Sequence, residues 1–224
     1  MRGVRTVRYT GRRLGSSGAC VALALACSPS PGVGQSHQAT AVFAGGCFWG
    51  VESVFEHVRG VRSATAGYSG GSVADPSYEL VETGGTGHAE SVRVVYDPAE
   101  VSYRQLLEVF FLVAHDPTTR DRQGPDAGSQ YRAIVFYQDS VQREIVRSYI
   151  AELTAHRALP GPIVTEVRPF QAFYQAEGYH QHYAARHPTQ LYIVINDAPK
   201  VARLRRLFPA LYVDAEGGQP PARP

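Results

Sequence analysis

The sequence predicts an α+β domain, organised as a two-layer sandwich around a mixed β-sheet. Segments in which apolar residues alternate with polar ones, as in strands, are interspersed with segments of helical periodicity. These segments follow one another in mixed order, which favours an α+β arrangement over a regular βαβ repeat. Two long polar loops interrupt them, and such loops within a compact domain usually carry function.

The first three elements are predicted from apolar runs separated by glycines. Residues 40–46 form an apolar run that ends in glycine, which predicts a strand. Residues 48–58 place apolar side chains at helical spacing, and Gly60 ends this helix. Residues 61–68 are predicted to return as a strand.

The middle of the chain combines loops with regular elements. Residues 69–87 are rich in Gly and Pro and predict a long loop, with one short helix around residues 78–82. Residues 89–96 alternate strongly and predict a strand that ends at Asp97-Pro98. Residues 102–113 predict an amphipathic helix capped by Ser102.

The remaining elements are predicted from the same signals. The second polar loop covers residues 115–129. The segments that follow are predicted, in order, as a strand (131–138), a helix (141–156), a strand (163–168), a short basic helix (199–208) and a loose C-terminal tail (209–224).

Charge and composition exclude several classes of protein. The chain has 224 residues, 44% of them hydrophobic, so it is long enough to bury a core and is not a disordered chain. Its net charge is +2, but five arginines and no acidic residue fall in the first 40 residues. The rest of the chain is therefore slightly acidic, and we expect no binding to nucleic acid.

The N-terminus has the parts of a secretory signal peptide. An arginine-rich stretch precedes an apolar run at residues 18–26, which ends in an A-x-A cleavage pattern. We therefore expect a signal peptide over residues 1–26 and a flexible linker over 27–39. The protein would be exported, either as a periplasmic protein or as a membrane-anchored lipoprotein. Cys27 follows the cleavage pattern and could carry a lipid anchor. If translation starts further downstream, the protein is cytoplasmic.

The three cysteines exclude a disulfide-stapled core and a four-cysteine zinc site. Cys47 stands alone at a predicted strand-to-helix junction. A helix N-terminus presents free N–H groups and the positive end of the helix dipole, which would lower the pKa of this thiol. The alternative is a buried cysteine that packs as a small apolar side chain.

Two polar segments further along the chain also contain candidate functional residues. Glu90 ends the segment Gly87-His88-Ala89-Glu90, and near an apolar site its carboxyl could keep a proton and act as a general acid. Residues 122–131 form a turn-rich loop that delivers Tyr131 at the start of a strand. The alternative is that Glu90 is a surface glutamate and that residues 122–131 form an ordinary surface loop.

Taken together, the motifs resemble the A-type peptide-methionine sulfoxide reductases (MsrA) over about residues 40–208. The segments that carry the resemblance are Gly46-Cys47-Phe48-Trp49-Gly50, Gly67-Tyr68, Pro76-Ser77-Tyr78, Gly87-His88-Ala89-Glu90, residues 122–131, Tyr179-His180-Gln181 and Pro199-Lys200-Val201. The resemblance implies that residues 40–208 are a catalytic domain, with a ferredoxin-like core and long active-site loops.

The resemblance also implies an activity and its main residues. Cys47 would attack the sulfur of the S epimer of methionine sulfoxide, in oxidised proteins, in peptides and as the free amino acid, and become a sulfenic acid. Glu90 would protonate the sulfoxide oxygen, which is a poor leaving group until it gains a proton. The remaining residues would bind substrate: Tyr78 and Tyr131 through hydrogen bonds to that oxygen, Phe48 and Trp49 around the methyl group, and Asp126 by ordering the polar loop.

The chain departs from the family pattern at the recycling step. Many family members carry one or two recycling cysteines near the C-terminus, but residues 48–224 contain no cysteine. We therefore expect an external thiol, such as thioredoxin or another thiol reductant, to reduce the sulfenic acid. Cys27 is the alternative resolving residue, because 19 residues of chain would let it reach Cys47.

Parts of the sequence also fit two other functions and a metal site. His115-Asp116 could complete a Cys-His-Asp hydrolase with Cys47, and a non-catalytic methionine-oxide-binding protein would keep the aromatic residues without needing Cys47 or Glu90. His180 and His182 could form a metal pair, but their segment is predicted to be helical and no carboxylate or cysteine completes a site in sequence. We expect no metal, no bound cofactor and a monomer; no dinucleotide fingerprint occurs.

Overall fold

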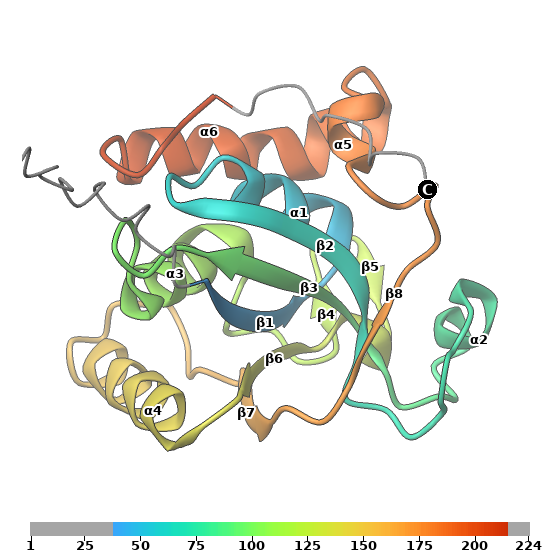
Figure 1. Cartoon of the computed structure of the whole chain (residues 1–224), viewed down its shortest axis with the longest axis horizontal. Coiled ribbons are helices and arrows are strands. Elements are labelled where there is room, and N and C mark those ends of the chain that lie inside the picture. The colour runs from blue at the N-terminus through green and yellow to red at the C-terminus, as the bar shows by residue number, and fades with distance from the viewer. Residues whose placement is uncertain (1–37, 215–224) are drawn as a thin grey trace, which may run out of the picture. The chain divides into compact units, whose positions relative to one another are not determined.

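A computed structural model describes residues 38–214, which form an α+β fold around a curled, mixed sheet of six strands (Figure 1). The strand order is β7-β6-β1-β3-β2-β8, and every neighbouring pair is antiparallel except β6 with β7. The strands are β1 (Ala39–Gly45), β2 (Val61–Ser69), β3 (Ala89–Tyr96), β6 (Ala133–Tyr137), β7 (Glu166–Pro169) and β8 (Phe173–Gln175).

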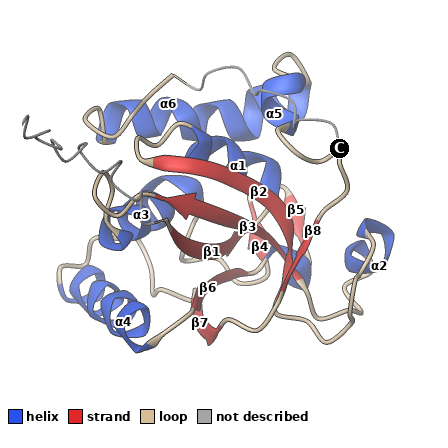
Figure 2. Ribbon diagram, in the orientation of Figure 1, coloured by secondary structure: helices blue, strands red, loops and turns tan. Residues whose placement is uncertain are grey.

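Helices flank this sheet (Figure 2). They are α1 (Phe48–Glu56), α2 (Tyr78–Glu82), α3 (Tyr103–Val109), α4 (Ser140–Ala155), α5 (Tyr183–Arg186) and α6 (Ala198–Leu207). A π-helical turn, Phe110–Ala114, continues α3, and a second one, Ile193–Asp197, leads into α6. The short strands β4 (Arg122–Gln123) and β5 (Asp126–Ala127) form a separate hairpin.

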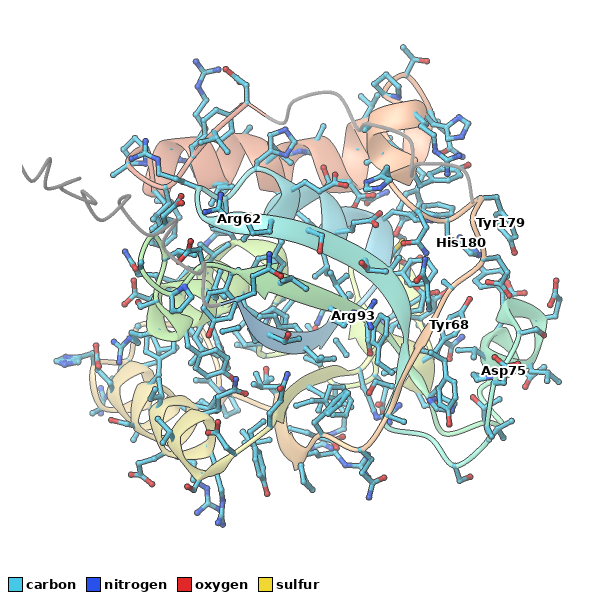
Figure 3. All side chains as sticks on the ribbon, viewed as in Figure 1. Arg62, Tyr68, Asp75, Arg93, Tyr179 and His180 are labelled. Atoms are coloured by element: carbon cyan, nitrogen blue, oxygen red, sulfur yellow. The ribbon has the colours of Figure 1, made fainter. Side chains whose placement is uncertain are left out.

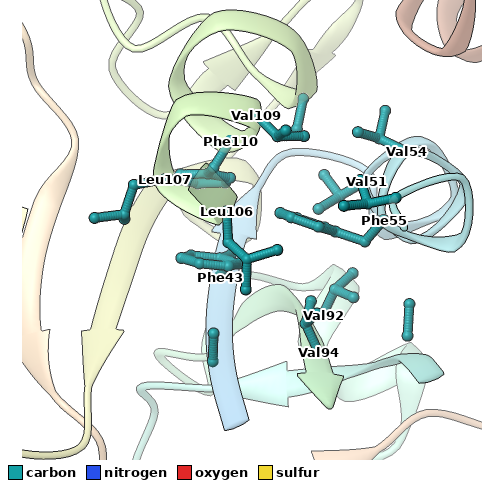
Figure 4. Packing of buried hydrophobic residues seen from close by; sticks show 14 of the residues in the cluster. Phe43, Val51, Val54, Phe55, Val92, Val94, Leu106, Leu107, Val109 and Phe110 are labelled. Atoms are coloured by element: carbon teal, nitrogen blue, oxygen red, sulfur yellow. The ribbon is translucent and has the colours of Figure 1, made fainter. Parts of the chain in front are cut away.

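The main core lies between one face of the sheet and the helices. Because side chains alternate along a strand, Phe43 of β1 faces the helices while its neighbour Val42 faces the other way. The Phe43 ring stacks at 4.7 Å from Phe110 and at 5.2 Å from Phe55 of α1 (Figure 4). This packing fixes α1, and therefore the residue that precedes it, relative to the end of β1.

A smaller apolar cluster covers the opposite face of the sheet. It consists of Val42, Ala44, Ala89, Ile134 and Phe136, with Phe170 and Phe173 packed against them. Phe170 directly follows β7 and Phe173 begins β8, so the chain that joins these two strands runs along that face.

The predicted α+β class is confirmed, and most predicted elements occur close to their predicted bounds. The predicted helix cap at Ser102 is present as a capping box: its hydroxyl accepts the Gln105 N–H at 3.2 Å, and the Gln105 side chain accepts the Ser102 N–H at 2.9 Å. A helix occurs where residues 102–113 predicted one, but its last turn is π-helical.

The sequence did not predict three features. The polar loop 115–129 contains the β4–β5 hairpin, β8 pairs with the edge of β2, and Tyr131 ends a 3₁₀ turn (Ser129–Tyr131) two residues before β6 begins. Phe173–Gln175 is too short to show a strand pattern, and its pairing partner is distant in sequence.

Residues 209–214, which were predicted to be loose, pack against the domain. Leu211 is buried, and Tyr212 forms an isolated bridge with Val58. The predicted signal peptide, the linker up to residue 37, and Cys20 and Cys27 lie outside the described residues, as does the tail from residue 215. Among the helices of residues 38–214, none combines the length and the apolar character needed to cross a membrane.

Candidate active site

The site begins at the sharp junction between β1 and α1. Cys47 is the N-cap of α1 and is only 8% exposed. Gly46 has a φ of +87°, a region that side chains rarely adopt, and a Cβ there would lie 2.4 Å from the Cβ of Gln123 in β4. Glycine at this position therefore allows the turn to close against the β4–β5 hairpin.

Glu90 of β3 is bound to the first turn of the same helix. Its side chain is buried, with 3% of the residue exposed, and its Oε2 accepts the backbone N–H of Phe48 at 2.9 Å. Phe48 is the residue next to Cys47, so the carboxyl group lies beside the thiol. This burial excludes the interpretation of Glu90 as a surface glutamate.

Burial raises the pKa of Glu90 to about 8, although the N–H of Phe48 opposes the change. The charged form loses its hydration there and recovers one hydrogen bond. Glu90 is therefore mostly protonated at neutral pH, which is the state that a general acid requires.

The predicted lowering of the Cys47 pKa is wrong for the protein without substrate. Burial raises the pKa of this thiol well above its ordinary value, and the charges of Glu90 and Asp197 add to the rise. The backbone N–H of Trp49 and the Lys200 ammonium oppose it without cancelling it. The helix N-terminus contributes less than expected because its first N–H, that of Phe48, is bound by Glu90.

Tyr78 and Tyr131 provide hydroxyl groups near these two residues. Burial raises the pKa of each phenol, and the charges of Glu90 and Cys47 raise both further. Both hydroxyls therefore keep their protons and act as hydrogen-bond donors. Tyr78 begins α2, inside the first long loop, whereas Tyr131 comes from the turn before β6.

Phe48 and Trp49 form an aromatic wall next to the thiol. The Phe48 ring is fully buried, 5.9 Å from Tyr68 and 4.9 Å from the ring of His180. The indole of Trp49 stacks on Tyr183 with ring centroids 3.8 Å apart. These faces are apolar and rigid, which suits a small apolar group.

His180 and Glu177, which the sequence argument did not assign to the site, hold this wall in place. The Trp49 indole N–H donates to Nδ1 of His180 at 3.1 Å, and burial lowers the pKa of the imidazole. Glu177 accepts the backbone N–H of Tyr78 and the hydroxyl of Tyr68, both at 2.8 Å. Figure 3 shows Tyr68 and His180 on the side of the sheet nearest α2.

The segment around His180 is a turn and not the predicted helix. The following helix, α5, begins only at Tyr183, and His182 adopts a left-handed conformation with φ +52°. In the sequence, His180 stands out only as part of the motif Tyr179-His180-Gln181. That motif contributes to the family resemblance but does not indicate what His180 does.

Asp126, predicted to order the polar loop, is held by Tyr192, which was not predicted. The Tyr192 hydroxyl donates to the Asp126 carboxylate, and the Tyr192 ring meets the Trp49 ring edge-on at 5.9 Å. Tyr192 therefore joins the β4–β5 hairpin to the aromatic wall.

The start of α6 packs directly on α1. A Cβ at Gly50 would lie 2.1 Å from Oδ1 of Asp197, so only glycine permits this approach. The same carboxylate oxygen accepts the Lys200 ammonium at 3.2 Å. The lysine thereby brings a positive charge near Cys47.

A cavity of about 540 Å³ reaches Cys47. Asp126, Tyr192 and Lys200 are among its lining residues, whereas Glu90, Tyr78 and Tyr131 are not. The thiol can therefore be approached from the side of the hairpin and α6.

His115 is not arranged to serve Cys47 as a base. Its Nδ1 is 2.8 Å from the Phe110 carbonyl and its Nε2 is 3.0 Å from the Thr165 hydroxyl, so both nitrogens have structural partners. Burial lowers the pKa of this imidazole to about 4. The Cys-His-Asp hydrolase interpretation is therefore not supported.

Comparison with known families supports the resemblance in the motifs. The family described as "Peptide methionine sulfoxide reductase" matches residues 39–210. "Peptide methionine sulfoxide reductase MsrA 2" of Mesorhizobium japonicum is 55% identical over 173 residues, which cover 77% of this chain and 89% of the relative. MsrA of Deinococcus radiodurans is 46% identical over 178 residues, covering 80% and 84%.

Solved structures agree with these sequence relatives. Methionine sulfoxide reductase A of Corynebacterium diphtheriae superposes with a TM-score of 0.61 at 36% identity, over 69% of this chain and 77% of that one. Mxr1 from Saccharomyces cerevisiae in reduced form gives a TM-score of 0.61 at 32% identity, over 68% and 87%.

Proposed function

The chain belongs to the peptide methionine sulfoxide reductase family, and on this premise we propose which of its residues perform the reaction. As a family member it reduces the S epimer of methionine sulfoxide to methionine. The observation that carries our assignment is the carboxyl group of Glu90, buried and mostly protonated, on the Phe48 N–H beside the Cys47 sulfur.

In the proposed reaction, the Cys47 sulfur attacks the sulfoxide sulfur while Glu90 gives its proton to the sulfoxide oxygen. This attack forms a transient bond between the two sulfur atoms. The protonated oxygen then moves to the Cys47 sulfur, which becomes a sulfenic acid, while the S–O bond of the substrate and the transient S–S bond both break and methionine is released. The substrate sulfur gains two electrons and the cysteine sulfur loses two. The thiol proton of Cys47 finally restores the proton on Glu90, so the step consumes no other reagent.

The remaining residues bind and orient the substrate in this scheme. The Tyr78 and Tyr131 hydroxyls donate to the sulfoxide oxygen, where negative charge builds up as the S–O bond breaks. Phe48 and Trp49 hold the methyl group. Asp126, fixed by Tyr192, orders the hairpin that borders the thiol.

The substrate assignment is tested with two peptides that differ only in the epimer of methionine sulfoxide. With dithiothreitol as reductant, we expect reduction of the S-sulfoxide peptide and no more than trace reduction of the R-sulfoxide peptide. Equal rates for the two epimers would contradict the assignment. Free methionine sulfoxide, tested in parallel, shows whether a peptide context is needed.

We further propose that an external thiol completes the cycle. Cys47 is the only cysteine among residues 38–214, and no other thiol in that part of the chain can attack the sulfenic acid. A first external thiol would form a mixed disulfide with Cys47 and release water, and a second would release the free Cys47 thiol. Thioredoxin, glutaredoxin and small thiols are candidate reductants.

The mass of the oxidised protein distinguishes this route from resolution by Cys27. After one equivalent of substrate without reductant, we expect the full chain to gain about 16 Da, the mass of one oxygen on Cys47. A Cys27–Cys47 disulfide would instead lower the mass by about 2 Da, and the external-thiol route would then be wrong. A Cys27→Ser variant is the control and should gain the same oxygen.

The physiological reductant is identified by comparing turnover rates. The same S-sulfoxide peptide is assayed with thioredoxin and its reductase, with glutaredoxin and glutathione, and with dithiothreitol. We expect a thioredoxin-like protein to support turnover at the lowest concentration. Turnover supported only by small thiols would exclude it as the partner.

Replacing Tyr192 with phenylalanine tests whether this residue orders the site. Loss of its hydrogen bond to Asp126 frees the hairpin, and we expect kcat/KM to fall roughly tenfold, mainly through a higher KM. Tyr212→Phe is the matched control, since the Tyr212 hydroxyl also donates to an aspartate, Asp214, but at the surface. Equal kinetics in both variants would remove Tyr192 from this role.

We also propose where in the cell the enzyme acts. The arginine-rich start, the apolar run and the cleavage pattern support export, with Cys27 as a lipid anchor, and the enzyme would then repair oxidised proteins outside the cytoplasm. Membrane and soluble fractions of cells that express the wild type and Cys27→Ser would separate an anchored from a released protein.

We also propose a ferredoxin-like arrangement for the central strands of the sheet. The connection order β1-α1-β2-β3-α3-β6, with pairing order β6-β1-β3-β2, supports a ferredoxin-like core for the central strands. We propose that this core acts as a monomer, which the mass measured by light scattering would test.

A further inference from the structure

Two carboxylates and an imidazole meet on α1, away from the reacting groups. Glu52 and Glu56 are four residues apart and so lie on one face of the helix. His182, from the turn before α5, lies against them, and one ligand atom from each of the three residues lies within 4.8 Å of the others. No sequence motif links the histidine to the two glutamates.

Glu52 is buried without enough partners for a carboxylate. The residue is 1% exposed, and its Oε2 accepts the backbone N–H of His182 at 2.8 Å. Its Oε1 makes no hydrogen bond of its own, since the nearby Ala66 N–H donates to the Gln181 side chain. Leaving a buried carboxylate oxygen unpaired costs free energy, and such groups usually mark a missing partner. Glu56 reaches the same place, where its Oε1 contacts Nδ1 of His182.

Arg186 is the positive side chain whose charge acts on Glu52, but it forms no ion pair with Glu52 or Glu56. The Arg186 guanidinium donates to the backbone carbonyls of Gly178, Tyr179 and Gln181. Its charge acts on Glu52 only from a distance. Within residues 38–214, no lysine or arginine side chain therefore forms an ion pair with Glu52 or Glu56, and a bound cation would supply that partner.

A cavity of about 810 Å³ gives access to the cluster. Glu56 and His182 line it. An ion could enter there, and water could occupy the coordination positions that the protein does not fill.

We propose that Glu52, Glu56 and His182 form a binding site for one divalent transition-metal ion, with Zn²⁺ as the best match. Two carboxylate oxygens and one imidazole nitrogen, with a water as the fourth ligand, suit the tetrahedral geometry of Zn²⁺. Mg²⁺ and Ca²⁺ prefer sites made only of oxygen ligands.

The site joins two parts of the catalytic machinery. Glu52 and Glu56 belong to the helix whose N-terminus carries Cys47, and His182 belongs to the turn that carries His180, the acceptor of the Trp49 indole. A bound ion fixes this turn to α1, so its role is to position the aromatic wall and not to react.

The two histidines of this turn have different partners in the structure. The sequence alone predicts no metal site at His180 and His182, because the segment has helical character and no carboxylate or cysteine accompanies the pair in sequence. In the structure His180 serves Trp49, and only His182 joins the cluster. The carboxylates come from residues 130 and 126 positions earlier in the chain.

The experiment measures Zn²⁺ binding by titration calorimetry to the untagged full chain. Cys20, Cys27 and Cys47 are replaced by serine in every sample, because thiolates would bind Zn²⁺ themselves. We expect one Zn²⁺ per chain, with affinity at least about tenfold weaker in His182→Ala and in Glu56→Gln. Matched controls are His156→Ala and Glu144→Gln, which change exposed residues of α4 or its C-terminal end.

Two results would overturn the proposal. One is no Zn²⁺ binding by the parent chain, and the other is equal affinity in the parent and in both cluster variants, which would indicate adventitious binding at surface groups. Circular dichroism identifies any variant that fails to fold. Glu56→Gln keeps the size of the side chain, so it remains a test even if His182→Ala does not fold. The visible absorption of bound Co²⁺ would report tetrahedral coordination with no cysteine ligand.

Discussion

A Cys47→Ser variant is expected to lose sulfoxide reduction by at least about a thousandfold. The hydroxyl of serine is a far weaker nucleophile than a thiol, and a stable sulfenic acid needs a sulfur atom. Because the residue is 8% exposed and serine is slightly smaller, we expect the fold to be preserved. Steady-state reduction of an S-sulfoxide peptide measures the effect.

The controls separate catalysis from binding. Cys20→Ser and Cys27→Ser should keep wild-type turnover, because both cysteines lie outside the matched domain, residues 39–210. Cys47→Ser should still bind the sulfoxide peptide, since the aromatic wall and both tyrosines remain. If Cys47→Ser reduced the peptide at the wild-type rate, the assignment of the nucleophile would be wrong.

The predictable part of the fold consists of elements with strong local signals. The strand at β3 was predicted with its observed bounds, because Val92, Val94 and Tyr96 alternate without interruption. The short helix α2 was also predicted at its observed position. By contrast, β8 depends on pairing with β2, more than a hundred residues earlier, and nothing in its own three residues indicates a strand.

The motifs pointed to residues that the structure brings together around Cys47, but the ionisation of these residues was not predictable from sequence. Helix-end electrostatics predicted a lowered pKa for Cys47, yet burial and two nearby carboxyl groups raise it. Those carboxyl groups, on Glu90 and Asp197, come from elements far from Cys47 in sequence. The pKa therefore depends on the tertiary fold, which no local pattern contains.

The sequence also did not predict which distant residues would form hydrogen bonds with the site residues. Tyr192 binds Asp126 across 66 positions of sequence, and His180 binds Trp49 across 131. Aromatic residues and histidines of this kind resemble ordinary core residues when only their neighbours in sequence are known.

Replacing Glu90 with glutamine is expected to slow reduction by roughly a hundredfold or more at neutral pH. Glutamine nearly preserves the shape of the side chain and removes the transferable proton. The sulfoxide oxygen must then take its proton from solvent. A small effect at pH 7 would remove Glu90 from the role of general acid.

The pH profile of the same variant provides a second test. In the wild type the acid must be protonated, so activity should fall as pH rises through about 8, the pKa of Glu90. In Glu90→Gln this fall should disappear, and the rate should increase toward acidic pH as solvent protons become more available. Loss of the Glu90 charge also removes one cause of the raised Cys47 pKa, so thiolate forms at lower pH. Both effects move the optimum to lower pH.

Glu82→Gln is the matched control for this profile. Glu82 is exposed, and its negative charge contributes to the raised pKa of Glu90 without contacting the proton that is transferred. Its replacement should therefore shift the alkaline fall slightly toward lower pH and leave the maximal rate near that of the wild type. If Glu90→Gln behaved like Glu82→Gln, the carboxyl group of Glu90 would act only through its charge, and the proton would have to come from another donor, for which Tyr78 and Tyr131 are the candidates.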